Sequence, residues 1–207
     1  MSRLYLARHG STSWTGARYC GRSDPPLDAR GRSQASALAD ALAREHLDQP
    51  RVVSSTAERC HETGMVIAGR LGAELTLDER LREVDFGAAE GLTFDELDRR
   101  FPPIARALLA GETCLDWPGG ERAADLARRA GDAWSDLVRA HATDVVVVAH
   151  AWVLRALLEV ALREGDLNAV PTIGCGMAAL LEWRPPSGRW RAAGFVPVAQ
   201  RMERAAG

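Results

Sequence analysis

The sequence contains no lysine: all 26 of its basic residues are arginines. Schiff-base chemistry and the lysine-bearing phosphate loop of nucleotide hydrolases both need that residue, so both mechanisms are excluded. The four cysteines, Cys20, Cys60, Cys114 and Cys175, lie far apart and include no C-x-x-C pair. Neither a zinc site nor a disulfide framework is therefore expected, and we propose no metal ligands.

Strong net charge and long apolar runs are also missing. The formal net charge is -2 and no basic stripe is present, so we expect neither nucleic acid nor a membrane as a partner. No run of about 18 apolar residues occurs, and the short apolar stretch near the N-terminus lacks the pattern of a signal peptide. These features predict a cytoplasmic protein. Its 207 residues, 46% of them hydrophobic, predict one domain over 1–207.

Short apolar runs alternate with helical patterns along the chain. The runs predict strands at 4–7, 52–53 and 144–149 and a late hairpin of 177–183 with 190–196; the helical patterns cover 31–46, 56–71, 93–100, 103–110, 121–141 and 152–163. This alternation predicts an α/β fold, a three-layer α/β/α sandwich with a mostly parallel central sheet and helices on both faces. Ligands bind such sheets at the carboxyl ends of the strands.

Two histidines end predicted strands. Arg8 and His9 follow the first strand, where a structural role and a functional role are about equally compatible with the sequence. His150 follows the apolar strand at 144–149 and precedes a helix, a position that favours function. We therefore expect both histidines at the same edge of the sheet.

A third arginine and a carboxylate complete a candidate anion site. Ser55 and Glu58 have the spacing of a capping box, which would place Arg59 in the first turn of a helix, although a solvated arginine is the ordinary alternative. Glu83 lies in a loop rich in acids and glycines. Arginines grip phosphate oxygens and a carboxylic acid supplies a proton to a leaving alcohol, so together these residues suit cleavage of a phosphate ester.

Seven segments in order along nearly the whole chain resemble the histidine phosphatase superfamily, also called phosphoglycerate-mutase-like. They are 8–12, 21–27, 31–35, 54–55 with Arg59 and Thr63, 81–83 with 86–87 and 90–91, 118–121 and 146–150. The resemblance implies that His9 accepts the phosphoryl group, that Arg8, Arg59 and His150 hold its oxygens, and that Glu83 donates the proton. It also implies substrate contacts at Arg8, Thr15, Arg22, Arg59 and Ala151, and no cofactor.

The activity implied is that of a phosphoric monoester hydrolase. The loop at 83–93 is similar to the phosphatase branch, whereas the mutase branch carries a longer arginine-rich insertion and a lysine-bearing stretch that this sequence lacks. We expect metal-independent hydrolysis of a small-molecule phosphate ester, such as α-ribazole 5'-phosphate or a sugar or glycerate phosphate, through a phosphohistidine. A phosphoglycerate mutase and an inactive phosphate-binding scaffold are the alternatives.

Three positions depart from the family pattern. Members usually carry glutamate or a similar residue at the position of Ser11 and asparagine at that of Thr15, which offers a hydroxyl but no amide. Ala151 and Trp152 follow His150 where glycines or small polar residues are common. Trp152 would either narrow the pocket or pack over the helix, with packing favoured.

Two further features bear on substrate choice and assembly. The segment 101–121 is a candidate lid in which Phe101 and Trp117 would contact substrate, unless these aromatic rings simply pack the lid. A homodimer is also predicted as an option, because Trp183 and Trp190 on the late hairpin could bury an edge of the sheet.

Overall fold

The structure is a computed structural model that describes residues 2–139, 143–162, 172–184 and 187–198. Its sheet contains six strands: β1 (Arg3–Arg8), β2 (Arg51–Ser54), β3 (Glu74–Leu77), β4 (Val145–Ala149), β5 (Ala178–Arg184) and β6 (Arg189–Phe195). They are ordered β3-β2-β4-β1-β5-β6. The first four are mutually parallel, whereas β5 runs antiparallel to both β1 and β6. The sheet is therefore mostly parallel, as predicted.

Six helices lie among the described residues: α1 (Ala29–Arg44), α2 (Glu58–Leu71), α3 (Phe94–Arg100), α4 (Pro102–Leu109), α5 (Ala123–Arg139) and α6 (Ala151–Ala161). Two short 3₁₀ turns, η1 (Glu79–Leu81) and η2 (Gly87–Ala89), precede α3. Each predicted helix is present, with ends within about two residues of the prediction. The predicted positions 140–141 and 163 lie outside the described residues.

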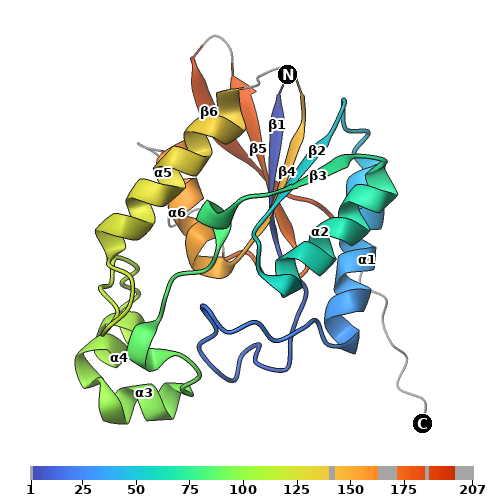
Figure 1. Cartoon of the computed structure of the whole chain (residues 1–207). Helices are drawn as coiled ribbons and strands as arrows, with labels where there is room; N and C mark the ends of the chain where they lie inside the picture. The colour runs from blue at the N-terminus through green and yellow to red at the C-terminus, as the bar shows by residue number, and fades with distance from the viewer. Residues whose placement is uncertain (1, 140–142, 163–171, 185–186, 199–207) are drawn as a thin grey trace.

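The helices cover both faces of the sheet (Figure 1). In β1, Leu4 and Leu6 pack in one core with residues of α5 and α6, while Tyr5 and Ala7 pack in the other core with residues of α1 and α2. Successive side chains of a strand point to opposite faces, so a strand that is apolar at every position must be covered on both sides. The three-layer α/β/α prediction is confirmed.

The sheet edges are less regular than its centre. The predicted hairpin is present as β5 and β6, although its turn at 185–186 lies outside the described residues. Strand β3 was not predicted, because its four residues are mostly exposed at the sheet edge and carry no apolar run. Trp190 packs against Trp134 and Trp183 of the same chain, with ring centroids 5.6 Å apart in both pairs. The homodimer stays a prediction.

The carboxyl ends of β1, β2 and β4 meet at one edge of the sheet. Helices α3 and α4 lie beyond this end and to one side of the sheet (Figure 1). Among the described residues, no helix combines the length and the apolar composition needed to cross a membrane.

Candidate active site

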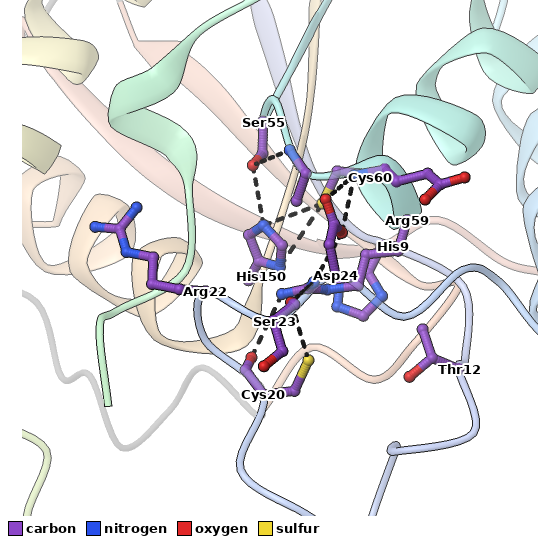
Figure 2. A network of polar contacts seen from close by, with 12 residues as sticks. His9, Thr12, Cys20, Arg22, Ser23, Asp24, Ser55, Arg59, Cys60 and His150 are labelled. Carbon is purple, nitrogen blue, oxygen red and sulfur yellow. Dashed lines mark hydrogen bonds and ion pairs between the residues drawn. The ribbon is translucent and has the colours of Figure 1, made fainter. Parts of the chain in front are cut away.

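His9 and His150 lie next to each other because the strands that they follow, β1 and β4, are neighbours in the sheet. The β1–β4 ladder ends with Arg8 opposite Ala149, and the next amide, that of His9, donates to the carbonyl of Ala149 at 3.1 Å. The ring centroids of His9 and His150 are 5.1 Å apart, with an interplanar angle of 62°. Figure 2 shows the two rings side by side.

The imidazole of His9 is held in one tautomer. Its Nδ1 lies 2.7 Å from the carbonyl oxygen of Gly10, and a carbonyl can only accept, so Nδ1 carries the hydrogen. In the neutral ring, Nε2 then keeps its lone pair. Gly10 also allows a close approach to helix α1, because a Cβ there would lie 2.2 Å from the carbonyl oxygen of Gly31. The amide of Gly10 donates to the hydroxyl of Thr63 at 3.2 Å, which ties this loop to α2.

Burial and positive charge keep both histidines neutral. The pKa of His9 falls from 6.5 to about 3, first through burial, then through the charge of Arg59 and, to a smaller extent, that of Arg8. The pKa of His150 is also well below its usual value, with burial again the first cause and Arg59 the second. The charge of Arg8 thus discourages an extra proton on His9, although burial and Arg59 contribute more.

The guanidinium of Arg59 is buried rather than solvated. Only 1% of this side chain is exposed, and its nitrogens donate to the backbone carbonyls of Ser23 at 2.8 Å and Gly21 at 3.2 Å. It also forms an ion pair with Asp24 at 3.2 Å. Arg59 therefore joins the start of α2 to the loop at 20–24, as the dashed lines in Figure 2 indicate.

The predicted capping box at Ser55 and Glu58 is wrong. Helix α2 has Ala57 at its N-cap, without a side-chain cap. The carboxylate of Asp24 instead accepts from the amide of Glu58 at 2.8 and 2.9 Å. The cap comes from a residue that is distant in sequence, so local spacing could not have identified it.

Ser55 contacts the second histidine instead. It follows β2, and its amide donates to the carbonyl of Val148 at 2.9 Å, so it lies on the opposite side of β4 from His9. Its hydroxyl oxygen is 3.0 Å from Nε2 of His150, and the sulfur of Cys60 is 3.3 Å from the same nitrogen. Neither contact could be predicted from local sequence, because each joins segments that are remote along the chain.

The carboxyl group of Glu83 lies at the N-terminus of α6. It accepts from the amides of Val84 at 3.0 Å, Trp152 at 3.2 Å and Val153 at 3.3 Å. Burial raises the pKa of Glu83, while the amides of Val84 and Trp152 and the nearby charges of Arg8 and Arg59 oppose that rise. A carboxyl group whose neutral form is favoured in this way is suited to donate a proton.

Arg8 lies within electrostatic range of all three titratable groups of the site. Its charge lowers the pKa of His9, His150 and Glu83, although in each case it ranks behind burial. Its Nη1 donates to the carbonyl of Ile173 at 3.3 Å, and its buried Nε has no hydrogen-bond partner among the described residues.

Three of the predicted substrate contacts remain: Thr15, Arg22 and Ala151. Thr15 is exposed, and its hydroxyl accepts from the amide of Thr12 at 2.9 Å. Arg22 points away from the two histidines in Figure 2. Ala151 is the first residue of α6 and is partly buried. Contacts of these three residues with substrate stay predictions.

Glu90 positions the loop beside Arg59, a role that the sequence did not indicate. Its carboxylate accepts from the amides of Gly21 at 3.0 Å, Arg22 at 3.3 Å and Ser23 at 3.1 Å. Because Arg59 donates to the carbonyls of the same loop, the segment is held from both sides.

The aromatic residues near the candidate lid pack against one another. Trp117 is 3% exposed, and its ring centroid is 4.5 Å from that of Phe86 and 5.7 Å from that of Trp152. Trp117 and Trp152 therefore pack against neighbouring aromatic rings. Movement of the segment 101–121 as a lid stays a prediction.

Acidification is expected to destabilise the protein through its two buried histidines. Between about pH 3 and pH 6.5 the folded state binds fewer protons at His9 than the unfolded chain does, and His150 acts in the same direction. The stability that each contributes is present above pH 6.5 and is lost as the pH falls through that window, at up to about 1.4 kcal/mol per pH unit. The raised pKa of Glu83 makes acidification stabilising at that group, but the two histidines together outweigh this single carboxyl group.

The measurement is chemical unfolding between about pH 7.5 and about pH 5, where most carboxylates stay ionised. Replacement of His150 by glutamine should flatten the decline in the free energy of unfolding. Equal slopes in wild type and the His150 variant would contradict the prediction.

Fold and geometry together define a class of site: a histidine with a lowered pKa at the carboxyl edge of an α/β sheet, close to the buried Arg59 and the partly buried Arg8. The sequence profile of the histidine phosphatase superfamily (branch 1) matches residues 4–196. The chain belongs to the histidine phosphatase superfamily, as the sequence motifs predicted.

Individual relatives agree with this assignment. A bifunctional protein of Mycobacterium tuberculosis is 37% identical over 167 residues, which cover 80% of this chain and 45% of that protein. The chain therefore spans less than half the length of this relative. Phosphoserine phosphatase 1 of Hydrogenobacter thermophilus is 33% identical over 181 residues, or 86% of this chain and 84% of the relative. A mycobacterial glucosyl-3-phosphoglycerate phosphatase solved with VO3 has a TM-score of 0.81 at 32% identity, covering 94% of this chain and 98% of the other.

Proposed function

We propose that this protein is a phosphoric monoester hydrolase that cleaves a small-molecule phosphate ester through a phosphohistidine at His9. The observation that carries the proposal is the hydrogen bond from Nδ1 of His9 to the carbonyl of Gly10, which leaves Nε2 free as a nucleophile. The lowered pKa of His9 keeps that nitrogen unprotonated near neutral pH. Family membership and the names of the relatives support the same reaction class.

Positive charge at the site serves the transferring phosphoryl group. Negative charge spreads over its three outer oxygens during transfer, so catalysis depends on in-line positioning and fixed cationic donors. Arg8 and Arg59 supply that charge, and His150 adds a ring nitrogen beside His9. Because burial weakens screening by water, each guanidinium acts more strongly here than at the surface.

Glu83 completes both halves of the reaction. In the first, a bond forms between phosphorus and Nε2 of His9, the bond from phosphorus to the ester oxygen breaks, and Glu83 gives its proton to the departing oxygen. In the second, water attacks the phosphorus, Glu83 takes a proton from that water, and the bond to His9 breaks. The raised pKa of Glu83 favours the protonated form that the first half requires.

The reaction as proposed uses no metal ion. Among the residues that the structure describes, no group of three or more histidine, cysteine, aspartate or glutamate side chains is arranged to hold one. The relatives named above act on phosphoserine and on glucosyl-3-phosphoglycerate, according to their names. The substrate we propose is accordingly a small phosphorylated metabolite, with Thr15, Arg22 and Ala151 as its further contacts, in one domain that includes 4–196.

The test is release of inorganic phosphate from para-nitrophenyl phosphate and a panel of phosphorylated metabolites, with and without a chelator. We expect hydrolysis that a chelator does not reduce. Activity that disappears on chelation and returns with a divalent cation would overturn metal independence. Isomerised phosphate esters without inorganic phosphate would indicate a mutase, and no turnover of any ester would indicate a scaffold.

A further inference from the structure

Glu121 and Arg129 form a buried ion pair beside the loop that carries Glu83. Nε of Arg129 is 2.6 Å from Oε1 of Glu121, and its Nη2 is 2.9 Å from Oε2. The two side chains are only 13% and 10% exposed. A two-pronged pair with this burial holds both side chains in one geometry, unlike a single-contact pair at the surface.

The third nitrogen of Arg129 reaches the Glu83 loop itself. Nη1 donates to the carbonyl of Arg80 at 2.5 Å and to the carbonyl of Arg82 at 2.7 Å. Arg82 immediately precedes Glu83. Arg129 therefore fixes the backbone on the N-terminal side of the proposed proton donor.

Glu121 fixes the backbone on the other side. Its Oε2 accepts from the amide of Asp85 at 3.3 Å, and its own amide donates to the carbonyl of Asp85 at 2.8 Å. Gly120 makes this approach possible, because a Cβ there would lie 2.2 Å from that same carbonyl oxygen. The same ion pair thus forms hydrogen bonds with the backbone on both sides of Glu83.

The carboxyl group of Glu83 is itself held by contacts with the backbone. Its hydrogen bonds go to backbone amides, those of Val84 and of the first turn of α6. Since a shift of about 1 Å in a reacting group can cost on the order of 100-fold in rate, the position of the loop matters for proton transfer. We propose that the Glu121–Arg129 ion pair is a positioning device that holds Glu83 on the leaving-group oxygen. This inference rests on the proposed function, specifically on Glu83 as the proton donor.

The test compares two esters that differ in their need for a proton. The phenolate released from para-nitrophenyl phosphate leaves readily without protonation, whereas the alkoxide of glycerol phosphate does not. We compare kcat/KM, which reports the first displacement, for wild type, Glu83→Gln, Arg129→Met and Glu121→Gln. Both ion-pair variants should lose about 10- to 100-fold more activity on the alkyl ester than on the aryl ester, as Glu83→Gln should.

A matched control separates positioning from general stability. Arg3 forms an ion pair with Asp144 at the opposite end of β1, with side chains 24% and 2% exposed. Arg3→Met should lower the free energy of unfolding and change kcat/KM for both esters by the same factor. If Arg129→Met does not fold, Glu121→Gln keeps the comparison available, because glutamine retains the shape of the side chain and one acceptor oxygen.

Two results would overturn the inference, and they can be told apart. If Glu83→Gln discriminates between the esters while Arg129→Met and Glu121→Gln do not, the pair is merely structural and the proposed function stands. If Glu83→Gln does not discriminate either, Glu83 is not the proton donor, and the mechanism proposed above fails with the inference.

Discussion

His9→Ala is expected to lower turnover by on the order of 10⁴-fold or more on every phosphate ester that the wild type hydrolyses. The substitution removes the nitrogen that forms the covalent bond to phosphorus, and His150 cannot replace it because its Nε2 contacts Ser55 and Cys60. The measurement is initial rate of phosphate release. Mass spectrometry of protein quenched during turnover should find one phosphoryl group on the peptide containing His9 in wild type and none in the variant.

The matched control for this loss is His61→Ala, which changes the same residue type on α2 outside the site. It should retain activity near that of wild type. Substantial turnover by the His9 variant, or an adduct found on another residue, would overturn the phosphohistidine mechanism.

Arg59→Met is expected to lower kcat/KM by about 10³-fold, the scale on which an arginine acts in phosphoryl transfer. The variant keeps much of the side-chain length but loses the charge that would hold phosphate oxygens. It also removes the donors to Ser23 and Gly21 and the ion pair with Asp24, so the free energy of unfolding should fall by about 1–3 kcal/mol. Arg59→Lys should recover little of the lost kcat/KM, because a single ammonium group cannot reproduce the paired donors of the guanidinium.

Arg70→Met on the same helix is the control. Its ion pair with Asp40 joins two side chains that are each 55% exposed, so its loss should cost at most about 1 kcal/mol and leave activity unchanged. Near-wild-type kcat/KM in the Arg59 variant would show that this guanidinium does not act on the transferring group. Equal losses in both arginine variants would attribute the effect to helix α2 instead.

The strands and helices of the central layers were predictable because their signals are local. The run of valines at 145–148 is typical of a strand buried on both faces, and it forms β4 near the centre of the sheet. The edge strand β3 was missed because Glu74–Leu77 gains its structure from pairing with β2 rather than from its own apolar pattern. Polar edge strands carry too little local signal to be distinguished from a loop.

The sequence predicted which histidines would meet at the ends of the strands, but not the contacts that support them. His9 and His150 were identified because each follows a buried strand, and ligands bind at that edge of the sheet. Asp24 and Glu90 were not assigned roles, and Ser55 was assigned a different one, because their partners lie 34 to 95 residues away along the chain. The capping prediction failed for the same reason: a nearby serine had the right spacing, but a distant aspartate occupies the position.

By itself, the sequence determined the alternation of strands and helices, the family and the identities of the residues expected to react, since each is written in local patterns of side chains. Only the tertiary structure decided which tautomer His9 adopts, how far burial lowers its pKa, and how Glu121 and Arg129 grip the Glu83 loop. Those properties depend on distances between segments remote in the chain and on the exclusion of water, and both arise only when the layers pack together.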